Sequence, residues 1–201
     1  MTSKIYSSPN SMVWEYYAII QRLTSRLDPT DEKAFRQDIA LCVLLAVTAV
    51  ESFLNLFFQV LITKPEYSTH DSFIQDSLNR RRSLEYKIKN WPKRVFGKHI
   101  DLTAGVGKRF AELKDLRNRL MHFGDVQREL DVAGAKLHNF TDITFYHALE
   151  ERDAWKALHT SLAFIVEVLK LASKDEKQLA GLTVQWTTYT LPVLSHLPYA
   201  E

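Results

Sequence analysis

The chain has few of the residues that interrupt helices or form covalent staples. It contains one cysteine, Cys42, inside an apolar run, which excludes an intramolecular disulfide framework and a cysteine-based zinc site. With only six glycines and six prolines in 201 residues, the composition favours helices over an all-β fold. The lone, apolar-flanked cysteine also leads us to expect a reduced, cytoplasmic setting.

Membrane-targeting features are also weak in this sequence. The first residues, "MTSKIYSSPNSMVWEYY", are polar and aromatic and lack the apolar core of a signal peptide. The longest apolar run, residues 39–63, is interrupted by Glu51, Ser52, Asn55 and Gln59, which makes it a poor membrane span. We therefore expect a soluble protein without a membrane partner.

What is present is a globular composition with segregated charge. The apolar fraction is 46% and the charged fraction 25%, which is typical of one folded domain of this length. Residues 80–119 hold 13 of the 26 Lys and Arg but only four of the 24 acids, so this segment carries +9 and the remainder −7. Segregation of this size attracts polyanions.

Apolar periodicity predicts an all-α fold, a single helical domain over residues 1–201. Helical spacing marks residues 12–27, a long and nearly all-apolar helix from Asp28-Pro29 to about residue 63, a third region over roughly 71–90 that "NWP" interrupts, and helices over 104–122 and 151–172. These segments predict an up-and-down bundle of about four to five main helices with the 31–63 helix at its centre.

Two segments have no clear helical pattern. Residues 124–150 form a long, polar connection whose length suggests a functional or partly ordered segment. The C-terminal tail, 174–201, is expected to be short and irregular. Within it, residues 182–191 alternate weakly, which fits either a short strand or a packed arm.

The stretch "DLRNRLMHF", residues 115–123, combines an apolar stripe with polar chemistry. On a helix Asn118 and His122 share a face, and Arg117 lies on the flank between that face and the core stripe. An imidazole exchanges a proton near neutral pH and a guanidinium grips phosphate, which together suffice for RNA cleavage without a metal. The alternative is a helix C-terminus whose cations complement its dipole.

The segment "RNRLMH", 117–122, resembles the Arg-x4-to-6-His motif of HEPN domains (higher eukaryotes and prokaryotes nucleotide-binding). The preceding long helix carries "VESFLN", residues 50–55, and its Glu51 and Asn55 are similar to the acidic residue and Asn of the same family. The resemblance covers about residues 35–172, which we take as the core. It implies a helical bundle with its motif near a helix end.

The resemblance further implies a homodimer whose two motifs face one cleft. In catalytic family members the activity is metal-independent endoribonuclease cleavage, here of the toxin or defence type. By this analogy His122 handles the proton, Arg117 binds the scissile phosphate, Asn118 orients His122 or the phosphate, and Glu51, with Asn55 on the same helix, holds Arg117 from behind. No cofactor and no metal are implied. The alternative is a non-catalytic HEPN-like module that binds nucleotide, RNA or a partner protein such as an antitoxin.

Basic residues interleaved with aromatics in "NRRRSLEYKIKNWPKRVFGKH" suit single-stranded RNA. The alternative is a solvated basic helix whose aromatics belong to the core. The RNA-binding candidates are Arg80, Arg81, Arg82, Lys87, Lys89, Lys93, Arg94 and Arg119, the last as a solvated or phosphate-steering residue.

Sequence motifs for nucleotide and metal binding are incomplete in this chain. "AGVGKRF", 104–110, lacks both the Walker spacing and a Ser or Thr after Lys108. No HExxH pattern occurs, and the histidines outside the motif are scattered, so no metal site is expected. We expect His159 to be a partly buried packing residue, Cys42 to lie in the core, and Asp125 to be a turn residue that could otherwise orient His122.

Overall fold

The computed structural model is a helical bundle, so the all-α prediction is confirmed. It describes residues 7–122, 126–127, 130–132, 135–137, 140–141, 143–194 and 196–197. The helices are α1 (Ser11–Thr24), α2 (Glu32–Ile62), the 3₁₀ segment η1 (Pro65–His70), α3 (Asp71–Asn79), α4 (Leu84–Phe96), α5 (Gly105–Met121), α6 (Thr144–His147), α7 (Glu151–Ala172), α8 (Glu176–Thr187) and α9 (Leu191–Leu194).

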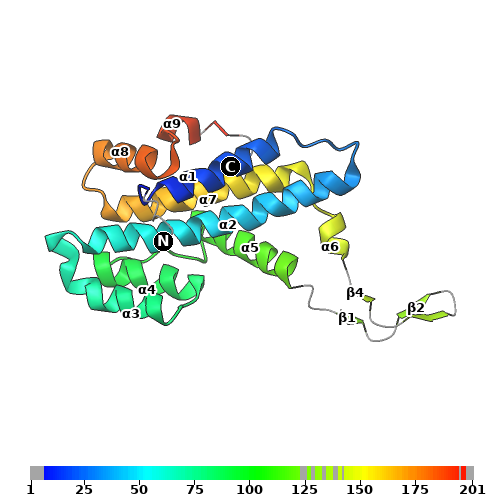
Figure 1. Ribbon diagram of the computed structural model, residues 1–201, viewed down its shortest axis with the longest axis horizontal. Helices are drawn as coiled ribbons and strands as arrows, with labels where there is room; N and C mark the ends of the chain where they lie inside the picture. The colour runs from blue at the N-terminus through cyan, green and yellow to red at the C-terminus, as the bar shows by residue number, and fades with distance from the viewer. Residues whose placement is uncertain are drawn as a thin grey trace, which may run out of the picture.

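The long helix α2 runs through the middle of the bundle, as the 31–63 prediction requires (Figure 1). Its buried residues occur on nearly every turn, and α1, α5 and α7 pack along it. It begins three residues later than the Asp28-Pro29 signal suggested. Asp31 is the N-cap and accepts a hydrogen bond from the Ala34 amide at 3.1 Å. Asp28 instead accepts from the Thr30 amide and closes the preceding turn.

By length and composition alone α2 could cross a membrane. Half of its most apolar 18-residue window is buried inside the bundle. Packing against neighbouring helices therefore accounts for part of its apolar character, as in the central helix of a soluble bundle.

The third helical region differs from the prediction. The break falls at 80–83, where Arg81 has φ 49° and Ser83 caps α4 by accepting from the Tyr86 amide. Pro92, expected to interrupt the helix, lies inside α4. Proline has no N–H to donate to the preceding turn. The helix nevertheless continues, and Trp91 and Val95 on either side of the proline are buried in the core.

The tail prediction is wrong: residues 176–187 form helix α8 and 191–194 form α9. Asp175 caps α8 by accepting from the Gln178 amide at 2.7 Å. Trp186 packs edge-on against Phe53 and Phe57 of α2, with ring centroids 5.3 and 5.6 Å away. The apparent alternation of Leu182, Val184 and Trp186 is therefore part of a helix.

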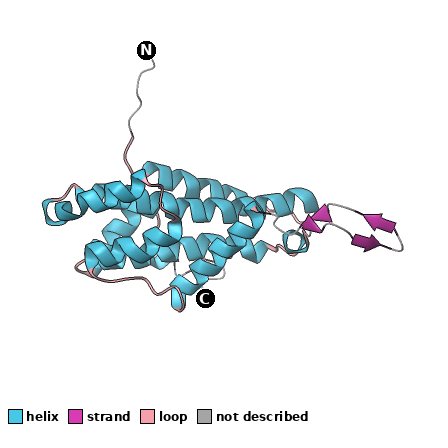
Figure 2. Cartoon of the chain, turned by 90° about the horizontal axis from the view of Figure 1, so that it is seen from below, coloured by secondary structure: helices cyan, strands magenta, loops and turns pink. Residues whose placement is uncertain are grey.

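The 124–150 connection contains short strands and α6. The strands are β1 (Val126–Gln127), β2 (Leu130–Val132), β3 (Ala135–Leu137) and β4 (Phe140–Thr141). β1 pairs antiparallel with β4, and β2 pairs antiparallel with β3. Figure 2 shows these strands standing beyond the end of the helical bundle. The bundle itself has its core among α1, α2, α4, α5, α7 and α8.

Candidate active site at the end of α5

Helix α5 presents the motif at its C-terminal end. Its buried face includes Phe110, Leu113 and Leu120, and the Phe110 ring stacks on Phe164 of α7 at 4.2 Å between centroids. Arg117 lies between Leu113 and Leu120 on this stripe and is half-buried. A half-buried side chain fits the flank position between the core stripe and the polar face that the spacing predicted.

The other two motif residues differ in exposure. Asn118 is half-buried and His122 is exposed. His122 is the C-cap of α5, where its backbone leaves the helix at φ −125° and its N–H donates to the Asn118 carbonyl at 2.9 Å. The neighbouring Met121 is 55% exposed. The three motif residues therefore lie within two turns of one helix end, with Arg117 and Asn118 half-buried and His122 exposed.

Arg117 has no ionic partner inside the described part of the chain, where no carboxylate oxygen lies within 4 Å of its guanidinium. A cation that is half-buried and unpaired is costly in a structural role, because burial weakens its hydration. The same cation is well placed to receive an anion from outside. Gly124 and Asp125, the predicted end of the helix and candidate orienting residue, lie outside the described residues.

Glu51 has a different partner from the one expected. Its carboxylate Oε1 accepts from Lys87 Nζ of α4 at 2.9 Å, whereas Arg117 was the predicted partner. The physical reason is that Lys87 points into the bundle, where its side chain is 6% exposed and needs a counter-charge. One turn along α2, the Oδ1 atom of Asn55 is buried and has no hydrogen-bond partner within the part of the chain that the structure describes.

A second ionic link joins α4 to the motif helix. Glu85 accepts from Lys89 at 2.7 Å and from Lys114 of α5 at 3.3 Å. The hydrogen bonds from Lys89 and Lys114 lower the pKa of the Glu85 carboxyl. Lys114 precedes Arg117 by about one helical turn. The Glu85–Lys114 ion pair therefore links α4 to α5 close to the motif, and the Lys87–Glu51 ion pair links α4 to α2.

The structure divides the predicted RNA-binding cations. The prediction that Lys87 is a surface cation available to RNA is wrong, because its side chain is buried against Glu51. Trp91 is also fully buried, so the core interpretation of that aromatic is confirmed and it is not available for stacking on a base. Lys89, Arg81 and Lys93 remain exposed.

Four further cations of the set lie against rings or acids on the surface. Arg82 lies over the Tyr86 ring at 5.0 Å and Arg94 over Phe73 at 5.8 Å. Arg80 pairs with Asp76 at 2.8 Å. Arg119 of α5 lies over Phe145 of α6 at 4.6 Å, so it helps fix the end of the motif helix.

His159 and Cys42 are both buried, as expected. Burial lowers the pKa of His159, and the nearby Arg109 charge lowers it further. Burial raises the pKa of Cys42 to about 12. No cluster of three or more His, Cys, Asp or Glu suited to a metal ion occurs among the residues that the structure describes.

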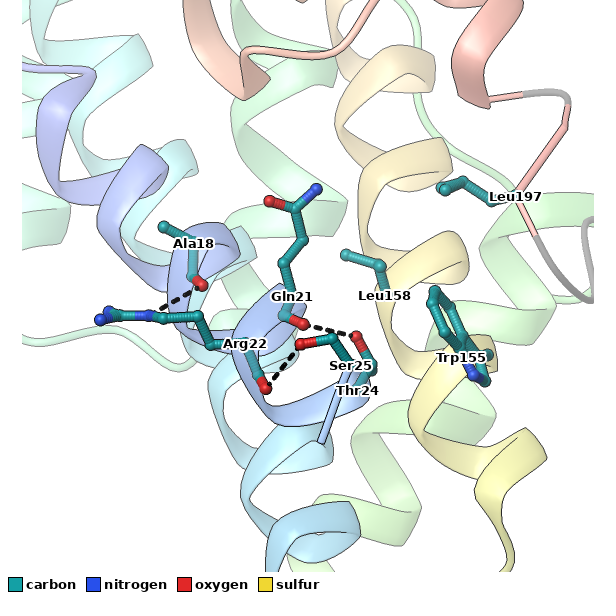
Figure 3. A pocket seen from close by; sticks show the side chains of 8 residues that line it. All are labelled: Ala18, Gln21, Arg22, Thr24, Ser25, Trp155, Leu158 and Leu197. Carbon is teal, nitrogen blue, oxygen red and sulfur yellow. Dashed lines mark hydrogen bonds between the residues drawn. The ribbon is translucent and has the colours of Figure 1, made fainter. Parts of the chain in front are cut away.

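An open groove of about 620 Å³ lies elsewhere, between α1 and α7 (Figure 3). Trp155 and Leu158 of α7 face α1 across it, with Leu197 at one end. Its hydroxyls are internally satisfied, because Thr24 and Ser25 donate to backbone carbonyls of their own helix. Sequence patterns did not predict this groove, since it joins residues more than 130 positions apart and carries no convergent titratable groups.

Comparison with family models, curated proteins and solved structures finds no match for this chain. The arrangement at the end of α5 therefore provides the basis for a functional assignment.

Proposed function

We propose that this protein is a metal-independent endoribonuclease of the HEPN type, active as a homodimer in toxin or defence systems. The supporting observation is the motif end of α5, where half-buried Arg117 has no carboxylate within 4 Å among the described residues and His122 lies exposed at the helix cap. A permanent cation set slightly inward and a proton-exchanging ring set outward suit a phosphodiester with a neighbouring hydroxyl.

In the proposed reaction the 2′-oxygen of RNA attacks the adjacent phosphorus and the bond from phosphorus to the 5′-oxygen breaks. One imidazole accepts the proton of the 2′-hydroxyl, and a second acid donates a proton to the departing 5′-oxygen. Arg117 binds the non-bridging phosphate oxygens, whose charge grows in the transition state. The products are a 2′,3′-cyclic phosphate and a 5′-hydroxyl, so no electrons are exchanged and no water is consumed.

The dimer supplies the second acid. Each chain has one His122 at this site, and a two-fold axis near the motif ends would place a second imidazole across the cleft. Met121, which is 55% exposed beside His122, gives the same end an apolar contact surface. Asn118, half-buried beside Arg117, then orients His122 or a phosphate oxygen.

The test uses mixed cellular RNA in the presence of EDTA. We expect His122→Ala to lower the cleavage rate by about 10²–10⁴-fold and Arg117→Ala by about 10²–10³-fold. Arg117→Lys should also be poor, because an ammonium lacks the planar fork. His99→Ala removes another exposed imidazole and is the matched control, with unchanged rate. Cleavage that survives His122→Ala, or that needs magnesium, contradicts the mechanism.

One observation favours the alternative, a non-catalytic module that binds nucleotide, RNA or a partner protein such as an antitoxin. Among the described residues nothing hydrogen-bonds the His122 ring, so none of these residues fixes its orientation. In that case RNA or nucleotide binds with an affinity that depends on Arg117, and no RNA is cut. Filter binding beside the cleavage assay separates the two functions.

A further inference from the structure

The turn between α3 and α4 presents two neighbouring cations. Arg81 and Arg82 are both exposed, and among the described residues neither has a carboxylate oxygen within 4 Å. Arg80, which precedes them, differs because it pairs with Asp76 at 2.8 Å. The turn therefore carries two positive charges that no acid in the described part of the chain offsets.

The backbone of Arg81 has an unusual conformation for this residue type. Its φ of 49° lies in the left-handed region, where a residue with a side chain costs about 1–2 kcal/mol more than in the right-handed region. A glycine would make the same turn without that cost. The turn itself therefore does not account for an arginine at this position, and its exposed charge is the property that needs a reason.

Arg82 is held at the surface by an aromatic ring. Its guanidinium carbon lies 5.0 Å from the centroid of the Tyr86 ring, one turn into α4. This contact restricts a long side chain, which lowers the conformational entropy that the side chain would lose on binding an anion. A guanidinium that stays charged and is already oriented suits a phosphate group.

The acids near this turn already have cationic partners. The one acid of α4, Glu85, accepts from Lys114 of α5 at 3.3 Å. On α5, Glu112 lies 3.9 Å from Lys108. Asp115 lies 3.7 Å from Lys114. The surplus positive charge of this basic segment is therefore carried by side chains, such as those of the turn, that have no carboxylate partner among the described residues.

The Glu85–Lys114 ion pair brings the turn close to the motif. Lys114 lies about one turn before Arg117 on α5, and Glu85 lies three residues after Arg82. Since a helical turn rises about 5.4 Å and three extended residues span at most about 10 Å, Arg82 and Arg117 are on the order of 20 Å apart. Figure 1 shows α4 and α5 on the same side of α2. An RNA strand of a few nucleotides can therefore reach from the motif to the turn.

We propose that the α3–α4 turn is a subsite for the RNA backbone, where Arg81 and Arg82 bind phosphates of the strand whose scissile phosphate lies at Arg117. This inference rests on the proposed function and extends it, because it names where the substrate is held away from the reacting bond. Cations that touch no reacting atom contribute to affinity and not to chemistry. Their loss should therefore raise KM and leave kcat unchanged.

Fluorescence anisotropy with a labelled oligouridylate of about 20 nucleotides measures binding in the full chain. The His122→Ala chain is the parent, so that the probe is not cut. Arg81→Gly/Arg82→Gln should bind about tenfold more weakly, and the slope of log affinity against log salt should become shallower by about 1.4, because each single-strand phosphate contact contributes about 0.7. Glycine suits the left-handed backbone, so this variant should melt no lower than its parent.

The matched control removes two charges from the opposite side of α2. Lys174→Gln/Lys177→Gln changes exposed lysines at the start of α8, neither of which has a carboxylate within 4 Å in the described ranges except Lys170-type neighbours of α7 that it leaves intact. Affinity and slope should equal those of the parent. If Arg81→Gly/Arg82→Gln gives the same values as this control, or if the parent chain binds no RNA, the proposal is overturned.

Tyr86 acts as a positioning residue for Arg82 in this proposal. Tyr86→Leu should weaken binding about two- to fivefold, because it releases the guanidinium from the ring. Tyr86→Phe keeps the ring and should restore the parent affinity. Equal weakening by both substitutions would contradict this role.

The outcomes for the subsite and for the nuclease can be told apart. A chain with His122 intact that binds RNA through the turn and cuts none supports the subsite and refutes the nuclease. Cleavage that His122→Ala abolishes, with the same KM in Arg81→Gly/Arg82→Gln as in the wild type, supports the nuclease and overturns the subsite. Binding to phosphatidylcholine–phosphatidylglycerol vesicles without binding to RNA overturns it in favour of a membrane surface.

Discussion

The ion pair between Glu51 and Lys87 should respond asymmetrically to removal of its two partners. The Lys87 side chain is 6% exposed and the Glu51 side chain 37%. Glu51→Gln leaves a buried ammonium without its counter-charge, which costs about 2–3 kcal/mol after allowing for the remaining amide acceptor. Lys87→Met leaves a carboxylate that water can reach and a side chain of similar size, which costs about 1 kcal/mol or less.

Urea denaturation followed by circular dichroism measures this difference. The expected gap of about 2 kcal/mol corresponds to roughly 4–8 °C in melting temperature for a chain of this size. The double variant Glu51→Gln/Lys87→Met should recover nearly to the level of Lys87→Met, because it contains no unpaired buried charge. Asp76→Asn, which breaks the exposed Asp76–Arg80 pair, is the control and should cost less than about 0.5 kcal/mol. If Lys87→Met is as costly as Glu51→Gln, the reasoning fails.

Four other predictions concern single residues of the bundle. A Cβ on Gly107 would lie 2.0 Å from the Asp101 carbonyl oxygen, so Gly107→Ala should destabilise the fold by about 2–3 kcal/mol. Gly181→Ala in α8, with open space at its Cβ, should stabilise it by about 0.5–1 kcal/mol in the same melts. Burial raises the pKa of Cys42 from 9.0 to about 12, so the native thiol should react with iodoacetamide at pH 8 about a thousandfold more slowly than in urea. Burial lowers the pKa of His159 below 6.5, so the unfolded state binds more protons and stability should fall as pH drops below about 6.5; His159→Gln should flatten that decline in acid-titrated melts.

Helices whose apolar residues recur with a clear helical period could be predicted from the sequence. Helices whose ends depend on local turn residues were harder to predict. The segments 12–27, 104–122 and 151–172 match α1, α5 and α7 to within three residues. Over residues 71–96 the sequence interpretation gave more weight to Pro92 than to the possible N-cap at Ser83. Ser83 was a readable N-cap, but Pro92 suggested a break that tertiary burial of Trp91 and Val95 overrides.

The tail failed for a different reason. Leu182, Val184 and Trp186 are spaced by two, which suggests a strand when only those residues are read. The helix depends on the N-cap Asp175, whose side chain accepts a hydrogen bond from the Gln178 amide. It also depends on contacts of Trp186 with residues of α2, which lie more than 120 positions away in the sequence. Packing partners at that separation leave no trace in the local pattern.

The residues of the candidate site could be predicted from the sequence, but the ion-pair partner of Glu51 could not. The helical period of 3.6 residues per turn predicted that Arg117, Asn118 and His122 lie at one helix end, and the structure has them at the C-terminal end of α5. The partner of Glu51 depended on whether α4 or α5 offers the nearer cation. Lys87 is 36 positions away in sequence, and only the packing of α4 against α2 selects it.

The fold treats Lys87 and Arg117 differently, and this contrast supports the proposed function. Lys87 is buried and has a carboxylate at 2.9 Å, which offsets its lost hydration. Arg117 is half-buried on the apolar stripe of α5, yet within the described ranges no acid lies within 4 Å of it. The C-terminal helix dipole contributes only about 0.3–1 kcal/mol toward holding such a cation. Since Arg117 gains little from the described residues, its position beside Asn118 and His122 is open to an anion from outside. In the proposed function that anion is the phosphate of RNA, which also brings the hydroxyl that His122 would deprotonate.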